Sequence, residues 1–563
     1  MMQLRPPSYK VTVEHDVAVA MRDGTVLRSI IYRPDAPGQF PVLITRTPYG
    51  SDDQPSDDRA IELAERGYVA VRQDIRGRYT SDGDFTNSLL GVAHTDVEDG
   101  YDSAQWCAQL PYSDGSVGTF GISYDGWTSW PMAASRPPAL RAMTSGGMAG
   151  DSRERDLSGV WRIATQLFGQ SGIATDARRR LNDHSGPQTM EHFEQVLQHS
   201  FHKWLWYLPL AELPDAVHGP TAEEVRNYLR RMPTRNEYDG PYHDEVEIPC
   251  LHLTGWYDIH LMCYKRFSEM RRLGRSPLAR ENQKLIIGPW RHNVMIMDPK
   301  EGDMDFGPEA DGSYSEIMCQ LYDHWLKGVD NGVMREPAVK LFVMGTNSWK
   351  TADDFPVPGT KYKTYYTHSG GRLGAEPPGD EPGDCYEYDP RDPVPSLLNF
   401  VNQPTPRDQR QLDYRRDILR YETDPLAEDL EIIGEPRATL HVASSALDTD
   451  FFVKLIDVHP DGRAINLCMG VMRARYRDGL DAPKLLTPGE PVKLEIQMLP
   501  TANRFFAGHR IRVAITSSDF PDFDRNHNTG GKDYEESQLR AARNTIFHDR
   551  QRATRVDLPI API

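Results

Sequence analysis

The sequence is poor in several features that mark other classes of protein. Its 563 residues include only six cysteines, and no two of them form a CxxC pair, so neither a zinc ribbon nor a disulfide framework is indicated. There is no HExxH, no GxGxxG after a strand and no GxxxxGK followed by Ser or Thr. We therefore expect no cofactor and no catalytic metal.

Basic charge and long apolar runs are also scarce. The formal net charge is -18, which disfavours a broad face for binding nucleic acid, because phosphate contacts need clustered Lys and Arg. No stretch is apolar enough to span a bilayer, and Arg5 and Lys10 stand where a signal peptide would have its apolar core. These absences predict a cytoplasmic protein that binds a small molecule, with no nucleic-acid or membrane partner.

The chain has enough apolar material for a large core. Hydrophobic residues make up 39% and charged residues 26%, and 563 residues exceed what one core accommodates. Within residues 1–150, Asp23-Gly24 between two apolar runs predicts an antiparallel hairpin. Short apolar runs at 42–44, 68–71 and 119–122 then alternate with helical stretches, which is typical of βαβ units around a parallel sheet.

Helical periodicity replaces the strands in residues 151–245, which we interpret as an inserted helical cap. Its clearest helix follows Pro220, with Thr221 and Glu224 as a capping box. One face of that helix is apolar, formed by Val225, Tyr228, Leu229 and Met232.

Strands return in residues 246–335, at 251–254 and 285–287, and a helix over 320–328 closes this second part of the α/β domain. Beyond residue 335 the apolar period drops to two, as in 492–498 and 511–515. The predicted fold class is α/β, an α/β-hydrolase domain with a helical cap and a C-terminal β-sandwich of jelly-roll type over 336–563.

The strongest functional signal is the stretch 118–127, in which a buried strand runs through small residues into a helix around Ser123. Such a strand-turn-helix is a nucleophile elbow, where a strained turn raises the serine hydroxyl and the next amide, that of Tyr124, points at a developing oxyanion. The general GxSxG pattern wants glycine two places after the serine, but Asp125 stands there and Gly126 follows. By itself the match also fits a glycine-rich turn with a surface serine.

A serine nucleophile needs a histidine base and a carboxylate that orients the histidine. The elbow predicts both downstream in the order Ser, Asp, His. Asp258 follows the strand at 251–254, and His292 follows the strand at 285–287. Both lie at carboxyl ends of predicted strands, where open α/β sheets bind ligands. We therefore predict the catalytic triad Ser123, Asp258 and His292.

Five stretches resemble the cocaine esterase group of bacterial acyl hydrolases, which are related to X-Pro dipeptidyl peptidases and α-amino acid ester hydrolases. The resemblance covers nearly the whole chain, implies a leaning towards homodimers, and explains the displaced glycine, since that group's elbow reads Gly-x-Ser-Tyr-x-Gly. It also implies that the hydroxyl of Tyr49 joins the Tyr124 amide in the oxyanion hole. The stretches are residues 47–49, 73–78, 121–126, 255–258 and 288–292.

Substrate preference is less well defined by the sequence. Trp161, Phe168 and His260 are candidates to bind the substrate, although aromatic residues at such spacing also serve as helix-packing core. Ile259 and Leu261 occupy positions where related amino-acid ester hydrolases carry acidic residues, so uncharged acyl groups are expected. The predicted activity is an acyl esterase acting through an acyl-enzyme intermediate. The alternatives are an amide-cleaving relative, or a carbohydrate-binding protein with an inert hydrolase domain.

Overall fold

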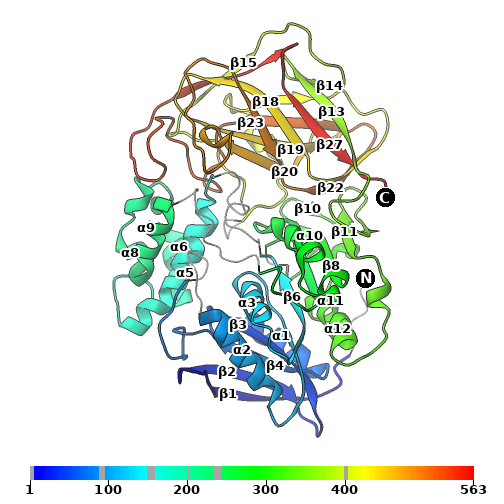
Figure 1. Ribbon diagram of the computed structural model, residues 1–563. Helices are drawn as coiled ribbons and strands as arrows, with labels where there is room; N and C mark the ends of the chain where they lie inside the picture. The colour runs from blue at the N-terminus through cyan, green and yellow to red at the C-terminus, as the bar shows by residue number, and fades with distance from the viewer. Residues whose placement is uncertain are drawn as a thin grey trace.

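The computed structural model describes residues 6–52, 54–87, 95–148, 159–200, 202–231, 242–292, 294–398 and 403–563. In the view of Figure 1, a layered α/β region and a β-rich region lie at opposite ends, with a group of helices at the side between them.

The α/β region is built on a ten-stranded sheet with the order β1-β2-β4-β3-β5-β6-β7-β8-β11-β12. The strands from β4 to β11 in this order run parallel, and β1, β2 and β12 add antiparallel edges. The predicted hairpin at Asp23-Gly24 is confirmed, since it joins β1 and β2. The bounds are β1 Val11–Ala20, β2 Val26–Pro34, β3 Phe40–Thr47, β4 Val69–Asp74, β5 Ser113–Thr119, β6 Leu140–Gly146, β7 Cys250–Tyr257, β8 Gln283–Arg291, β11 Val339–Val343 and β12 Ser348–Ala352.

Helices cover both faces of this sheet. Alternate residues of one strand join different apolar clusters: Leu43 packs with α1 and α12, whereas Val42 and Ile44 pack with α2, α3, α10 and α11. The central strands are therefore buried on both faces, as expected for a parallel sheet. The helices are α1 Gln54–Glu65, α2 Thr95–Ala108, α3 Tyr124–Ala134, α10 Tyr264–Leu273, α11 Pro277–Glu281 and α12 Tyr314–Trp325.

The sheet continues past residue 335, where we expected the second domain to begin. β11 pairs in parallel with β8, and β12 returns beside β11. The expected boundary therefore falls inside this sheet, because an apolar period of two does not tell which sheet a strand joins.

Where the structure describes it, the segment between β6 and β7 is largely helical, as predicted. Val225, Tyr228 and Leu229 of the helix after Pro220 are buried, while Met232 lies outside the described residues. Thr221 belongs to a short 3-10 turn, and its hydroxyl donates to the carbonyl of His218. The elements are α5 Ile163–Leu181, α6 Met190–Ser200, α7 His202–Leu205, η1 Leu210–Glu212, α8 Asp215–His218, η2 Gly219–Thr221 and α9 Ala222–Arg231.

The β-rich region contains an eleven-stranded sheet and two two-stranded sheets. The large sheet comprises β13 Lys361–His368, β14 Arg372–Gly374, β15 Asp384–Tyr388, β16 Leu419–Glu422, β18 Arg437–Ser444, β19 Asp450–Val458, β20 Ala464–Arg473, β21 Val492–Gln497, β23 Arg510–Thr516, β24 Ala542–Ile546 and β27 Arg555–Ile560. The small sheets pair β17 Leu430–Gly434 with β22 Thr501–Phe505, and β25 His548–Asp549 with β26 Arg552–Ala553. Another small sheet, before β11, pairs β9 Lys300–Glu301 with β10 Met304–Asp305. Further 3-10 turns are η3 Leu261–Cys263, η4 Pro308–Ala310, η5 Val333–Arg335, η6 Gln409–Leu412 and η7 Ala474–Tyr476.

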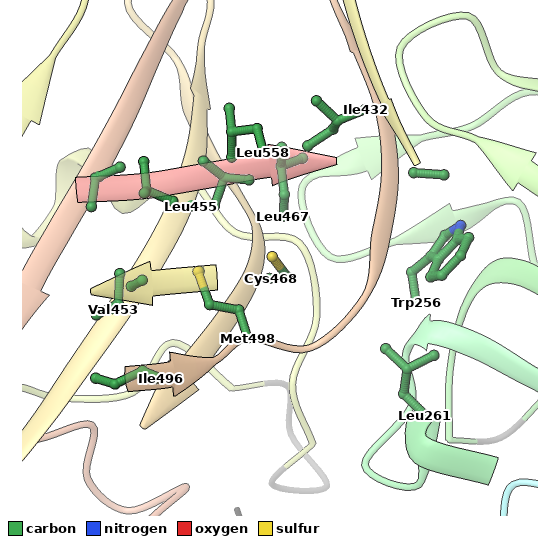
Figure 2. Packing of buried hydrophobic residues seen from close by; sticks show 14 of the residues in the cluster. Trp256, Leu261, Ile432, Val453, Leu455, Leu467, Cys468, Ile496, Met498 and Leu558 are labelled. Atoms are coloured by element: carbon green, nitrogen blue, oxygen red, sulfur yellow. The ribbon is translucent and has the colours of Figure 1, made fainter. Parts of the chain in front are cut away.

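One apolar cluster spans the junction of the α/β and β-rich regions. Trp256 and Leu261 from the α/β region share it with Leu455, Leu467 and Ile432 from the β-rich strands (Figure 2). The two regions therefore share one core. Over the described ranges, every helix is too short or too polar to cross a lipid bilayer.

A buried arginine ties the β-rich strands to the helical segment. The Arg473 guanidinium contacts Asp450 at 3.0 Å, Asp524 at 2.9 Å and Asp533 at 3.1 Å. Asp524 in turn accepts a hydrogen bond from the backbone N–H of Trp161 at 2.9 Å. Burial raises the pKa of Asp450 and Asp524, and the charge of Arg473 counteracts that rise.

We expect Arg473→Leu to lower the free energy of unfolding by about 3–5 kcal/mol, because it leaves buried carboxylates without their cation. Urea and thermal denaturation followed by circular dichroism measure the change. Arg463→Leu is the matched control, since Arg463 pairs with Asp461 at the surface at 2.8 Å and should cost less than about 1 kcal/mol. Equal losses in the two variants would contradict the prediction.

Candidate active site

Neighbouring parallel strands bring the predicted catalytic residues, and Gly147 with them, to one edge of the sheet. Ser123 lies shortly after β5, and Gly147 directly after β6. Asp258 directly follows β7, and His292 directly follows β8. Because β5, β6, β7 and β8 pair in this order and run parallel, their carboxyl ends meet at the same edge.

Ser123 occupies a strained turn between β5 and α3. Its backbone has φ 61 and ψ -129, in the left-handed half of conformational space that side chains rarely adopt. Its N–H donates to the carbonyl of Gly146 at 3.0 Å, and its own carbonyl accepts from Trp127 N–H at 2.9 Å. Such a conformation costs roughly 1–3 kcal/mol and persists only where the surrounding structure holds it. The geometry is that of the predicted nucleophile elbow.

Two glycines allow the turn around Ser123 to close. A Cβ on Gly121 would lie 2.5 Å from the backbone of Asp125. A Cβ on Gly126 would lie 2.9 Å from the carbonyl oxygen of Gly146 and 3.1 Å from that of Gly121. Glycine is thus required three places after the serine, because that position packs against β6.

Asp258 and His292 form a close pair. His292 Nδ1 lies 2.7 Å from Asp258 Oδ1, and Asp258 is 2% exposed. The same carboxylate accepts the backbone N–H of His260 at 2.8 Å and the hydroxyl of Thr254 at 3.2 Å. These two donors hold the carboxylate in place. The role of Thr254 was missed from the sequence, although it lies four residues before Asp258 on the strand that delivers it.

Gly147 lies close to Asp258, His292 and the residue before Ser123. A Cβ at this position would lie 3.0 Å from Asp258 Oδ2, 3.3 Å from His292 Cε1 and 3.2 Å from Ile122 Cγ2. Its φ of +51 also favours glycine. Ile122 directly precedes Ser123, so the nucleophile turn and the Asp258–His292 pair approach the same small volume. The sequence analysis did not single out Gly147.

Tyr49 lies over the nucleophile turn. Its hydroxyl interacts with the side chain of Ser123 and the backbone of Tyr124, and its ring meets the Tyr124 ring edge-on at 6.3 Å. The side chain is 40% exposed, but its hydroxyl end is enclosed: burial is the main cause that raises the pKa of Tyr49, followed by the charge of Asp125. The phenol therefore stays neutral and can donate a hydrogen bond.

The turn that carries Tyr49 is held by residues of β4 and of the loop that follows it. Arg78 Nε donates to the carbonyl of Pro48 at 2.9 Å, and Arg72 Nη2 donates to that of Gly50 at 3.0 Å. Asp74 accepts the backbone N–H of Ser51 at 2.6 Å, and burial raises the pKa of Asp74 to about 6. Residues 73–78 carry part of the family resemblance, but the sequence alone indicated no role for them.

A small cavity of about 60 Å³ lies beside Asp258. Two ion pairs contribute to its lining, Arg162 with Asp522 at 2.8 Å and Lys454 with Asp519 at 2.8 Å. Its volume suits a few water molecules. Both carboxylates are already matched by cations.

The predicted substrate-binding residues lie in different surroundings. Trp161 is 1% exposed in an apolar cluster of the helical segment, its ring 6.3 Å from that of Tyr534, and Phe168 packs on Phe193 at 5.2 Å. The His260 ring lies 5.0 Å from that of His292. Only His260 is brought next to the Asp258–His292 pair, and a role in substrate binding remains a prediction for all three.

Comparisons with known proteins place both parts of the chain in one family. Residues 23–294 match the model for X-Pro dipeptidyl-peptidase (S15 family), and residues 331–557 match the model for the X-Pro dipeptidyl-peptidase C-terminal non-catalytic domain. The chain is 34% identical to the cocaine esterase of Rhodococcus sp. (strain MB1 Bresler) over an alignment of 589 residues. This alignment covers 98% of each protein.

Solved structures show the same fold. An aminopeptidase from a marine sediment Thaumarchaeota archaeon superposes with a TM-score of 0.79 at 23% identity, covering 99% of this chain and 98% of the other. An α-amino acid ester hydrolase superposes with a TM-score of 0.74 at 23% identity and the same coverage.

Gly126→Ala should disrupt the nucleophile turn, because the added methyl group has no space against β6. We expect slower labelling of Ser123 by a fluorophosphonate probe and a lower Tm. Gly169→Ala, in α5, is the matched control: nothing lies within 4 Å of the added Cβ, and alanine should stabilise the helix by about 0.5–1 kcal/mol. Normal labelling and stability in Gly126→Ala would contradict this account of the turn.

Proposed function

Because the chain belongs to the cocaine esterase family and is a serine ester hydrolase, we propose that Ser123, His292 and Asp258 form its catalytic triad. The observation that carries the proposal is the 2.7 Å contact between His292 Nδ1 and Asp258 Oδ1, at the sheet edge that also holds the strained Ser123 turn. The family membership confirms the expected fold, an α/β-hydrolase-like part followed by a β-rich part. It also removes support from the carbohydrate-binding alternative.

Each residue has a defined role in the proposed mechanism. The Ser123 hydroxyl attacks the ester carbonyl and passes its proton to His292 Nε2, while His292 Nδ1–H donates to Asp258 and keeps the ring in the required tautomer. His292 then protonates the leaving alcohol. Water enters by the reverse sequence and hydrolyses the acyl-enzyme.

The tetrahedral intermediate carries an oxyanion that needs preorganised donors. We assign these donors to the backbone N–H of Tyr124 and the hydroxyl of Tyr49. The contacts of Arg78, Arg72 and Asp74 with the turn around Tyr49 hold this hydroxyl in place before the substrate arrives. Little reorganisation is then needed when the charge develops.

Ser123→Ala and His292→Ala should each lower kcat by several orders of magnitude in a folded protein, because triad members act as a unit. Asp258→Asn should be nearly as damaging, since the asparagine favours the wrong histidine tautomer. Steady-state hydrolysis of an aryl ester measures the loss, and circular dichroism checks the fold. Full activity in folded Ser123→Ala would refute the mechanism.

Tyr49→Phe should lower kcat by about 10²–10³ with little change in KM, because it removes one oxyanion donor that acts mainly in the transition state. Tyr9→Phe is the matched control, since Tyr9 is similarly exposed, at 36% against 40% for Tyr49, and has no proposed role. A change in KM alone would instead identify Tyr49 as a substrate-binding residue.

We also propose that the acyl group of the substrate is uncharged. Ile259 and Leu261 are buried beside Asp258, and the two cavity carboxylates Asp519 and Asp522 already have cationic partners. A substrate ammonium would lose its hydration without gaining a free carboxylate from these residues. Asp151, Glu154 and Asp156, which could supply another acidic site, lie outside the described residues.

A benzoate methyl ester should therefore exceed the matching phenylglycine methyl ester in kcat/KM, and X-Pro anilides should be poor substrates. Parallel initial-rate measurements under one buffer condition test the order. A tenfold or greater preference for phenylglycine would show that an ammonium site exists elsewhere in the chain, and cleavage of X-Pro anilides at comparable rates would favour the amide-cleaving alternative.

A further inference from the structure

A cluster of two histidines and one aspartate lies in the β-rich region, outside the proposed active site. Asp457 stands near the end of β19, His459 in the turn that follows, and His509 directly before β23. One ligand atom from each of the three lies within 4.8 Å of the others. We propose that these three residues bind a divalent transition metal of the zinc type.

The side chains are already partly arranged around a common point. His509 Nδ1 lies 2.7 Å from Asp457 Oδ1, and His459 Nε2 lies 4.0 Å from Asp457 Oδ2. The two imidazole rings are 4.5 Å apart and inclined by 40°. Ligands of one tetrahedral zinc ion lie about 3.3 Å apart. A shift of less than about 1 Å, which the turn holding His459 can supply, brings that pair within range.

The donor set selects the class of metal. Two imidazole nitrogens and one carboxylate oxygen suit Zn²⁺, Co²⁺ or Ni²⁺, whereas Mg²⁺ and Ca²⁺ prefer oxygen ligands throughout. Asp457 and His509 are buried, while His459 is partly exposed and gives the ion a path from solvent.

The surroundings of the cluster supply a second layer of contacts. Asn503 Nδ2 donates to Asp457 Oδ2 at 3.3 Å, and the backbone of Asn503 bridges to Met344 directly after β11. Tyr257, which precedes Asp258, donates its hydroxyl to the carbonyl of Asn466 on β20 at 3.0 Å. A bound ion would thus link the β19–β20 turn to the start of β23 at the junction with the α/β region. Its role would be structural.

Zinc titration of chelator-treated full-length protein tests the proposal. Isothermal titration calorimetry should show an equivalent of Zn²⁺ that His459→Ala and Asp457→Asn bind more than about tenfold more weakly, since even outer-shell changes have effects of that size. Zn²⁺ should raise the Tm of the wild type and not that of the variants, because binding to the folded state stabilises it. Mg²⁺ should do neither.

His260→Ala is the matched control, because the His260–His292 pair could also take up zinc. The His260→Ala variant should still bind the equivalent of Zn²⁺ that His459→Ala binds more weakly, and with the wild-type affinity. His459→Ala leaves the contact between Asp457 and His509 intact, so it should fold. Unchanged zinc affinity in His459→Ala and Asp457→Asn, or a zinc-dependent Tm shift that only His260→Ala removes, would overturn the proposal.

Discussion

Close backbone packing at the carboxyl edge of the parallel sheet is the constraint on which the site depends. The Ser123 turn closes only because Gly126 lets α3 approach β6. A side chain at position 126 would place its Cβ 2.9 Å from the Gly146 carbonyl oxygen. The same requirement recurs at Gly255 and Gly288, where a Cβ would lie 2.0 Å from the Trp290 carbonyl and 2.2 Å from its ring, respectively. Glycines therefore decide how closely α3 approaches β6 and how closely the Asp258 and His292 strands pack at this edge.

The β-rich region supports this edge rather than standing apart from it. Its strands share an apolar cluster with Trp256, next to the strand end that delivers Asp258. The hydroxyl of Tyr257 reaches the carbonyl of Asn466 in β20, and Arg473 is linked through Asp524 to the start of the helical segment. Because these contacts are buried, a change in the β-rich strands can alter the position of Asp258.

Charged side chains near the site are held in ion pairs. In the cavity beside Asp258, the cations of Arg162 and Lys454 match Asp522 and Asp519, so these two carboxylates are already paired when an ionic substrate arrives. Tyr49 adds a donor without adding charge, because burial raises its pKa and keeps the phenol neutral. A neutral, preorganised donor of this kind suits an ester whose negative charge appears only in the transition state.

The sequence by itself determined the order of the strands that carry Ser123, Asp258 and His292, because apolar period and small residues are local properties of the chain. It also predicted the hairpin at Asp23-Gly24 and the helical segment before β7. It could not assign β11 and β12 to the first sheet, nor find Gly147 and the Asp457 cluster with its partner 52 residues away. Only the tertiary structure decided these, since they depend on pairing and contact between segments distant in the chain.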